Sequence, residues 1–245
     1  MKEHRVLGLI IARAGSKTVP NKNMRILAGK PLLEYTLKAA TASEGLDKII
    51  ISTDSPEMAR FAESHDVEAP FIRPTELSND TAQSHDVILH ALEFLQKNND
   101  YQPDGVMLLQ PTSPFRTSKD ISECVRLFSA ENVDGVVSIT PADKHPYTTK
   151  MLSSDGRIAP FFPQADMTAN RQTWPKAYLL NGAIFLRQTA VYRLWRSRLS
   201  SGGNPEGKRV LGYVMPPERS IDIDNELDFL LAESIITKLG ISKWG

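Results

Sequence analysis

The chain has 245 residues, of which 41% are hydrophobic and 24% charged, an ordinary balance for a globular protein with one sizeable core. Its 29 basic and 29 acidic residues give a formal net charge of zero, which argues against a surface built to attract nucleic acid or an anionic membrane. The single cysteine, Cys124, excludes an intrachain disulfide, and the apolar run at 6–12 is too short for a membrane span. We therefore expect a cytoplasmic protein.

Short apolar runs without strict alternation recur along the chain and predict buried strands of a parallel sheet. They cover 6–12, 48–53, 105–110 and 135–140, followed later by regular structure at 177–186 and a strand at 210–215. Helices are predicted from Pro31 through 40, after an N-cap at Ser55, over 87–95, after the capping pair Thr117 and Asp120, over 189–199 and over 225–239. This alternation predicts an α/β fold with a doubly wound, mostly parallel sheet, built as a single domain over 1–245. The ligand site is expected beyond the carboxyl ends of the strands, in the loops after Ala12, Thr53 and Gln110.

The stretch 141–176 interrupts this alternation. It holds five prolines and the aromatic residues Tyr147, Phe161, Phe162 and Trp174, and it is too long and too aromatic for an ordinary loop. Aromatic side chains on such an excursion would form an exposed apolar patch in a monomer. We therefore expect 141–176 to be a dimerisation insertion that packs on another subunit.

A basic segment follows the first predicted strand. No acidic residue occurs between Glu3 and Glu34, whereas Arg13, Lys17 and Lys22 all fall there. A turn at Gly15 can direct backbone N–H groups toward phosphate oxygens, and the cations can compensate a triphosphate. The spacing matches neither a P-loop nor a dinucleotide fingerprint, which disfavours a dinucleotide-binding oxidoreductase. The structural alternative is an exposed basic turn.

A pair of carboxylates stands near the end of the chain, in Asp222-Ile223-Asp224. On an extended segment, side chains two residues apart share a face, so both carboxylates can converge. Carboxylates that share a cation with phosphate oxygens and water suit Mg²⁺. The structural alternative is a polar turn that precedes the final helix, in which Asp228 is a favourable charge near the helix start.

Other polar segments have both structural and functional interpretations. Gln110 and Thr112 end a predicted buried strand, where the prolines of "QPTSP" fix the backbone. Ser84 could simply cap the helix that follows it, and Asn181 could form a turn or bulge with Gly182. The histidines show no metal-ligand spacing, and His85 and His90 are expected on a helix surface.

Several blocks of the sequence together resemble the acylneuraminate cytidylyltransferases, also called CMP-sialic acid synthetases. These blocks include "IIARAGSKTVPNKNMRILAGKPLLEYTL", "RPTELSNDTAQSHDVILHALE", "LLQPTSPFRT", "NGAIFL" and "SIDIDNELD", and they span nearly the whole chain. The resemblance implies a sugar-nucleotidyltransferase (Rossmann-like) fold, CTP as donor, an acidic nine-carbon sugar as acceptor, Mg²⁺ as cofactor and a homodimer. The zero net charge, for its part, leads us to expect no nucleic-acid or membrane partner.

The resemblance also implies roles for individual residues. Lys17 and Lys22 would be catalytic, and the metal would be held by Asp222 and Asp224. The nucleotide would contact Ala12, Arg13, Ser16, Asn23, Arg73, Ala82 and Ser84. The acceptor sugar would contact Gln110, Thr112, Arg171 and Asn181.

One position departs from the family pattern. Members commonly carry an arginine two residues before the Asn-Gly pair, whereas Leu179 stands there in this chain. The departure leaves the acceptor open among N-acylneuraminate, legionaminate, pseudaminate and 3-deoxy-manno-octulosonate. A nucleotide-binding module without turnover is the alternative from another functional class. The sequence shows no general base.

Overall fold

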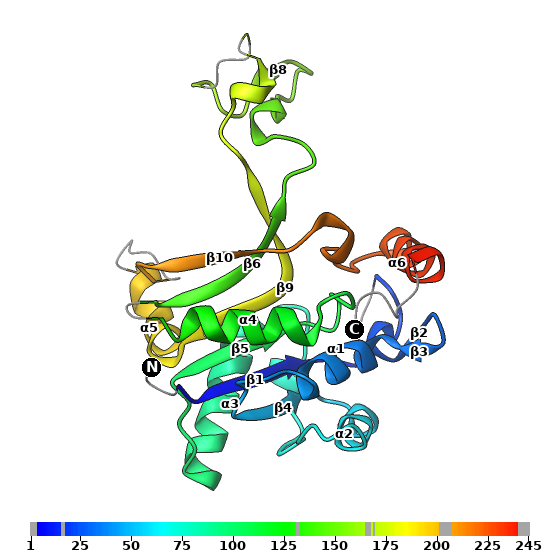
Figure 1. The fold of residues 1–245 in the computed structure, drawn as a ribbon, viewed down its shortest axis with the longest axis vertical. Helices are drawn as coiled ribbons and strands as arrows, with labels where there is room; N and C mark the ends of the chain where they lie inside the picture. Colours follow the sequence, from blue (N-terminus) through cyan, green and yellow to red (C-terminus); the bar gives the residue numbers. More distant parts are fainter. Residues whose placement is uncertain are drawn as a thin grey trace.

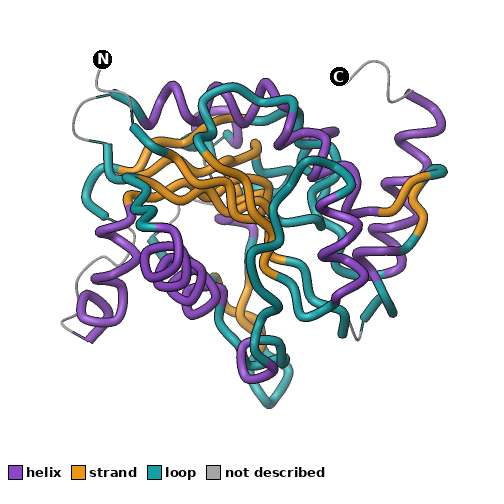
Figure 2. Tube along the Cα trace, turned by 90° about the horizontal axis from the view of Figure 1, so that it is seen from below, coloured by secondary structure: helices purple, strands orange, loops and turns teal. Residues whose placement is uncertain are grey.

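The computed structural model describes residues 4–15, 18–130, 133–164, 168, 170–200 and 207–239. Its centre is a six-stranded sheet in the order β10-β6-β9-β5-β1-β4, which Figure 2 shows as a single twisted layer between helices. The strands are β1 (Val6–Ile11), β4 (Lys48–Ser52), β5 (Gly105–Leu109), β6 (Gly135–Pro141), β9 (Tyr178–Gln188) and β10 (Val210–Val214). All neighbours pair in parallel except β9, which runs antiparallel between β5 and β6.

Successive side chains of β1 point to opposite faces of the sheet, and both sets are apolar, so both faces must be covered. Val6 and Ile10 belong to one buried cluster, and Leu7 and Leu9 belong to another. Helices α1 (Leu32–Thr41), α2 (Pro56–Glu63) and α4 (Ser118–Phe128) pack on the first face. Helices α3 (Ser84–Asn99) and α5 (Thr189–Ser200) pack on the second. The predicted doubly wound α/β fold is therefore confirmed.

The predicted helix starts at Ser55 and Thr117 are also confirmed. The Ser55 hydroxyl accepts a hydrogen bond from the α2 backbone, and Thr117 and Asp120 form a reciprocal capping box at α4. The buried Asp120 carboxylate accepts further hydrogen bonds from the Tyr213 hydroxyl at 2.8 Å and from Arg219. Since Arg219 ends the turn η5 (Pro217–Arg219), this contact attaches α4 to the segment that leads to residues 222–224.

A third buried cluster holds the final helix, α6 (Glu226–Leu239), against the rest of the domain. Phe229 and Ile236 of α6 pack with Leu27 of the small hairpin β2 (Ile26–Leu27) and β3 (Lys30–Pro31). Ile223 is fully buried in the same cluster. The apolar side chain between Asp222 and Asp224 therefore anchors the carboxylate segment. None of the described helices combines the length and the apolar character needed to cross a bilayer.

The described residues within 142–177 form an arm that projects from the sheet (Figure 1). The β6–β9 ladder ends at the pair Pro141 and Tyr178, and the arm beyond it carries η3 (Pro146–Thr148), β7 (Lys150–Leu152), β8 (Ile158–Pro160) and η4 (Arg171–Thr173). Within the arm, an aromatic cluster joins η3 to the segment after η4: His145 lies 4.5 Å from Tyr147 and 4.9 Å from Trp174 between ring centroids. Its tip exposes Met151, Leu152, Ile158 and Phe161.

Candidate functional site

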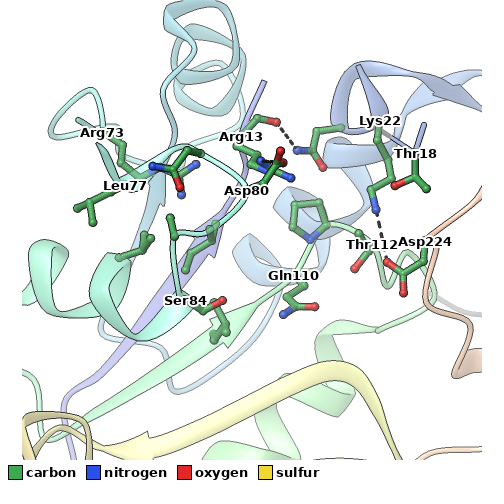
Figure 3. Close-up of a pocket in the computed structure, with 17 residues that line it drawn as sticks. Arg13, Thr18, Lys22, Arg73, Leu77, Asp80, Ser84, Gln110, Thr112 and Asp224 are labelled. Atoms are coloured by element: carbon green, nitrogen blue, oxygen red, sulfur yellow. Dashed lines mark hydrogen bonds and ion pairs between the residues drawn. The ribbon is translucent and has the colours of Figure 1, made fainter. Parts of the chain in front are cut away.

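A cavity of about 340 Å³ lies at the carboxyl ends of β1 and β5, as expected for this fold (Figure 3). Three segments enclose it: the loop after β1, the connection from η2 (Thr75–Leu77) to α3, and the loop after β5. Asp224 closes one end of the cavity. The site is therefore built from parts of the chain that only the sheet topology brings together.

Most of the residues predicted for the site line this cavity. They are Arg13, Lys22, Asn23, Arg73, Ala82, Ser84, Gln110, Thr112 and Asp224. Ser16 and Lys17 lie outside the described residues. Ala12 is buried at the end of β1, where its N–H donates to the carbonyl of Ser52 at 3.1 Å. Asp222, Asn181 and Arg171 are not part of the lining.

The basic segment is attached to the carboxylate segment by Lys22. Its ammonium donates to the carbonyl of Ile223 at 2.6 Å and lies 3.7 Å from Asp224 Oδ1. The Lys22 side chain is only 12% exposed, so this charge is held in a defined place. The side-chain amide of Asn23 donates to the carbonyl of Arg13 at 3.0 Å and fixes the loop from within. Two segments about 200 residues apart in the sequence thus meet at one edge of the cavity.

Two arginines reach the other end of the cavity. Arg13 pairs with Asp80 at 2.7 Å, and Arg73 donates to the Ser78 hydroxyl at 3.1 Å. Burial lowers the pKa of Arg73, the carboxylate of Asp54 opposes this shift, and the charge of Arg13 adds to it. The two guanidinium groups therefore repel each other across a cavity that favours an anionic ligand.

Asp222 faces inward, whereas Asp224 is exposed. Burial raises the pKa of Asp222, the hydrogen bond from Thr112 opposes the shift, and the charge of Asp224 adds to it. Asp222 Oδ1 has no hydrogen-bond partner among the described residues. Gly182, at φ +76°, leaves room for the carboxylate, because a Cβ at that position would stand 2.6 Å from Asp222 Oδ2. The half-buried carboxylate thus keeps one oxygen without a protein partner, which a ligand could use.

Asn181 is occupied by internal hydrogen bonds. Its carbonyl oxygen accepts from Ser138 Oγ at 2.6 Å, and its amide donates to Ser220 Oγ at 2.9 Å. The residue is 5% exposed and lies where the β6–β9 register shifts. The predicted bulge with Gly182 matches this geometry, and the side chain connects β6, β9 and the segment before Asp222.

Arg171 and Leu179 lie away from the cavity. Arg171 begins η4 on the arm, with its guanidinium 6.0 Å from the Trp174 ring centroid. Leu179, which replaces the family arginine, is 47% exposed on β9 near the base of the arm. Neither side chain lines the cavity of its own chain.

A second cavity of about 240 Å³ adjoins the first, and Ser84, Leu108 and Gln110 line both. Its further lining is mostly aromatic and apolar: His85, Ile88, Phe185, Arg187, Tyr192 and Trp195. The His85 ring stacks on Trp195 with centroids 5.7 Å apart. The expectation that His85 lies on a helix surface is therefore wrong: its first-turn position on α3 faces α5.

The alternative role of Ser84 as a helix cap is not observed either. Helix α3 begins at Ser84 itself, Gln83 stands at the N-cap, and no side-chain hydrogen bond caps the helix. Sequence reasoning also missed Asp80, which pairs with Arg13, and Trp195 of the second cavity. The lack of acidic residues between Glu3 and Glu34 could have indicated such a partner, because the cations of this stretch need carboxylates from other parts of the chain.

Comparisons with known proteins agree with this architecture. Residues 7–194 match the cytidylyltransferase family. The solved structure of CMP:2-keto-3-deoxy-manno-octonic acid synthetase complexed with CTP superposes with a TM-score of 0.69 and covers 96% of this chain and 99% of that one. Its sequence identity is 14%, so this likeness concerns the fold alone.

Curated relatives are considerably closer in sequence. The N-acylneuraminate cytidylyltransferase of Escherichia coli O18:K1:H7 is 37% identical over 96% of this chain and 52% of its own length. The CMP-N,N'-diacetyllegionaminic acid synthase of Legionella pneumophila is 34% identical over 95% of this chain and 96% of its own length. The chain thus spans about half the length of the N-acylneuraminate cytidylyltransferases that it matches and nearly all of the legionaminic acid synthase.

The surroundings of Asp222 predict a stability change on substitution. Because its pKa is raised in the fold, ionising this carboxyl costs folding free energy, and the cost appears as the pH rises through the raised pKa. We expect Asp222→Asn to melt at the same or a higher temperature than wild type at neutral pH with a chelator present. The difference should shrink in acid. Asp224→Asn, at a side chain 76% exposed, is the matched control and should melt like wild type. If Asp222→Asn melted clearly below wild type at neutral pH, the claim that ionised Asp222 destabilises the fold would be wrong.

Proposed function

Because the chain belongs to the cytidylyltransferase family, we propose that it transfers CMP from CTP to the anomeric hydroxyl of an N-acylneuraminate and releases pyrophosphate. The observation that carries the proposal is a pair of adjoining cavities with different linings. One is polar and carries Arg13, Lys22 and Asp224, and the other is aromatic. A nucleotide with its phosphates suits the first, and an acylated sugar suits the second.

The first cavity supplies what an in-line transfer at phosphorus needs. Such transfers are catalysed mainly by positioning and by stabilisation of charge. Lys22 would stabilise charge on the α-phosphate and the leaving pyrophosphate, and Arg13 would meet further phosphate oxygens. Ser16 and Lys17 belong to the same stretch of the sequence and keep their predicted roles in the proposal. Arg73, Ala82 and Ser84 would surround the cytosine.

The acceptor would extend from Gln110 into the second cavity. Gln110 and Thr112 offer polar groups for the sugar hydroxyls at the junction. The rings of Phe185 and Tyr192 offer an apolar surface that an acyl group can cover. An acylated nonulosonate uses this surface, whereas 3-deoxy-manno-octulosonate has no acyl group to place there. Legionaminate and pseudaminate remain alternative acceptors, because both are acylated.

Magnesium is part of the proposal. The unpartnered oxygen of Asp222 and the exposed Asp224 fit a hard cation that shares phosphate oxygens and water. No group of three or more His, Cys, Asp or Glu side chains forms a metal cluster within the described ranges, so phosphate and water would complete the shell. When bound there, Mg²⁺ would compensate phosphate charge and lower the pKa of the attacking hydroxyl. Thr112 and Ile223 hold the carboxylate segment in place.

A homodimer and a cytoplasmic site of action complete the proposal. The exposed apolar tip of the arm is suited to pack on a second copy. Arg171 lies on that arm, so it would meet the carboxylate of an acceptor held by the partner subunit, where a bidentate guanidinium contact is favourable. The single cysteine is a buried thiol, which suits a reducing compartment.

Pyrophosphate release tests the reaction. With CTP and Mg²⁺, we expect N-acylneuraminate and its acylated analogues to be turned over well and 3-deoxy-manno-octulosonate poorly. Lys22→Ala should lower turnover roughly 100-fold or more, since a preorganised charge at the transition state is lost. Lys30→Ala, outside the lining of the first cavity, is the control. CTP binding without turnover of any acidic sugar would instead favour a non-catalytic nucleotide-binding module.

The metal assignment has its own test. We expect Asp224→Asn to lose turnover mainly through weaker use of Mg²⁺, because an amide keeps the shape but removes the charge that holds a hard cation. Raising Mg²⁺ should restore part of the rate, while CTP affinity falls less than turnover. Direct titration with Mn²⁺, followed by its paramagnetic signal, should show weaker binding to the variant. Unchanged metal dependence in a folded, active variant is the contrary outcome.

The dimer is tested by light scattering at micromolar concentration. We expect wild type to be dimeric, and a double change at the arm tip, Leu152→Glu with Ile158→Glu, to give a folded monomer, because both side chains are at least 70% exposed. Leu227→Glu introduces the same charge on an exposed leucine of α6 and should stay dimeric. A monomeric wild type at this concentration would count directly against the proposal.

A further inference from the structure

The contact between Arg13 and Asp80 crosses the first cavity. Arg13 follows β1, whereas Asp80 lies on the connection before α3, and both line the cavity (Figure 3). Arg13 Nη1 stands 2.7 Å from Asp80 Oδ1. Arg13 belongs to the segment that the proposed function assigns to the phosphates. The Asp80 carboxylate is therefore paired with the guanidinium group that a bound phosphate would contact.

Asp80 is held at this place by a defined turn. The side-chain oxygen of Asn79 accepts hydrogen bonds from the N–H and the hydroxyl of Thr81, at 2.9 and 2.8 Å. The Asn79 amide donates to the carbonyl of Glu76 at 2.9 Å. These bonds set the backbone on both sides of Asp80. The carboxylate is thus presented to the cavity by local structure.

The contact is weak enough to be displaced. The side chains of Arg13 and Asp80 are 35% and 40% exposed, and ion pairs this exposed typically change an equilibrium constant only about two- to fivefold. A polyphosphate also meets Lys22 and backbone N–H groups, so it gains more than the pair loses. The two arginines of the cavity meanwhile repel each other, so an anion beside Arg13 is favourable whatever its source.

We propose that Asp80 is an internal counter-ion that competes with polyphosphate for Arg13, and that it thereby limits how tightly nucleotide and pyrophosphate are held. The proposal rests on the assignment of Arg13 to the phosphates in the proposed function. Competition weakens the binding of every ligand whose phosphates reach Arg13. It also favours release of pyrophosphate, because Asp80 restores the charge balance of Arg13 when the product leaves. Asp80 is then a residue that tunes turnover without contacting the reacting atoms.

Calorimetric titration tests this with CTP, pyrophosphate and cytidine, in the absence of an acceptor sugar. At low ionic strength, Asp80→Asn should bind CTP and pyrophosphate about two- to fivefold more tightly than wild type. Cytidine affinity should not change, because cytidine has no phosphate to meet Arg13. The gain should shrink as salt is added, since exposed charges are screened. Glu76→Gln removes an exposed carboxylate from the same connection without touching Arg13 and should match wild type.

The outcomes separate this inference from the proposed function. A wild-type protein that binds CTP no better than other nucleoside triphosphates contradicts the proposed function. A wild-type protein that binds CTP normally, with an Asp80→Asn variant that binds it equally or less tightly, overturns the competition. Tighter binding of cytidine to the variant also overturns it, because the change then acts through the shape of the base pocket. Equal gains in affinity for Asp80→Asn and Glu76→Gln would mean that the loss of any nearby negative charge has the same effect. That result would also overturn the proposed competition for Arg13.

Discussion

The site depends on the excess of positive charge in the segment that follows β1. This segment carries several cations to the carboxyl edge of the sheet, and no acidic residue between Glu3 and Glu34 balances them locally. The compensating groups come from distant parts of the chain: Asp54 accepts from the N–H of Ala14, Asp80 pairs with Arg13, and Glu226 pairs with Arg25 at 2.6 Å. The isolated segment has no such partners, because only the assembled sheet brings these carboxylates to it.

The fold was predictable from the sequence because its local signals agree with one another. Continuous apolar runs marked β1, β4, β5 and β6, and the caps at Ser55 and Thr117 fixed two helix starts. The rule that places ligands at the carboxyl ends of strands selected the loops after β1, β4 and β5, and those after β1 and β5 line the cavity. The loop directly after β4 is not part of its lining. The orientation of β9 was not predictable, because an apolar strand has the same pattern in either direction.

The details that escaped prediction are those set by long-range packing. The i, i+2 rule predicted that Asp222 and Asp224 can converge, but it gave no sign that Asp222 would be half-buried against Gly182 while Asp224 stays exposed. His85 was expected at a surface because its own helix gives no sign of α5, which covers it with Trp195. A single sequence shows which residue types are present at an edge. It does not show which of them will be enclosed by an element a hundred residues away.

The central position of β9 restricts where the chain can change length. This strand carries the arm at one end, Gly182 against Asp222 in its middle, and Phe185 of the second cavity further on. Side chains alternate between the faces of a strand, so inserting or deleting one residue in β9 would exchange its two faces and misplace these contacts together. The arm lies outside the ladder that ends at Pro141 and Tyr178. Related chains are thus free to lengthen or shorten the arm, whereas β9 itself must keep its residue count.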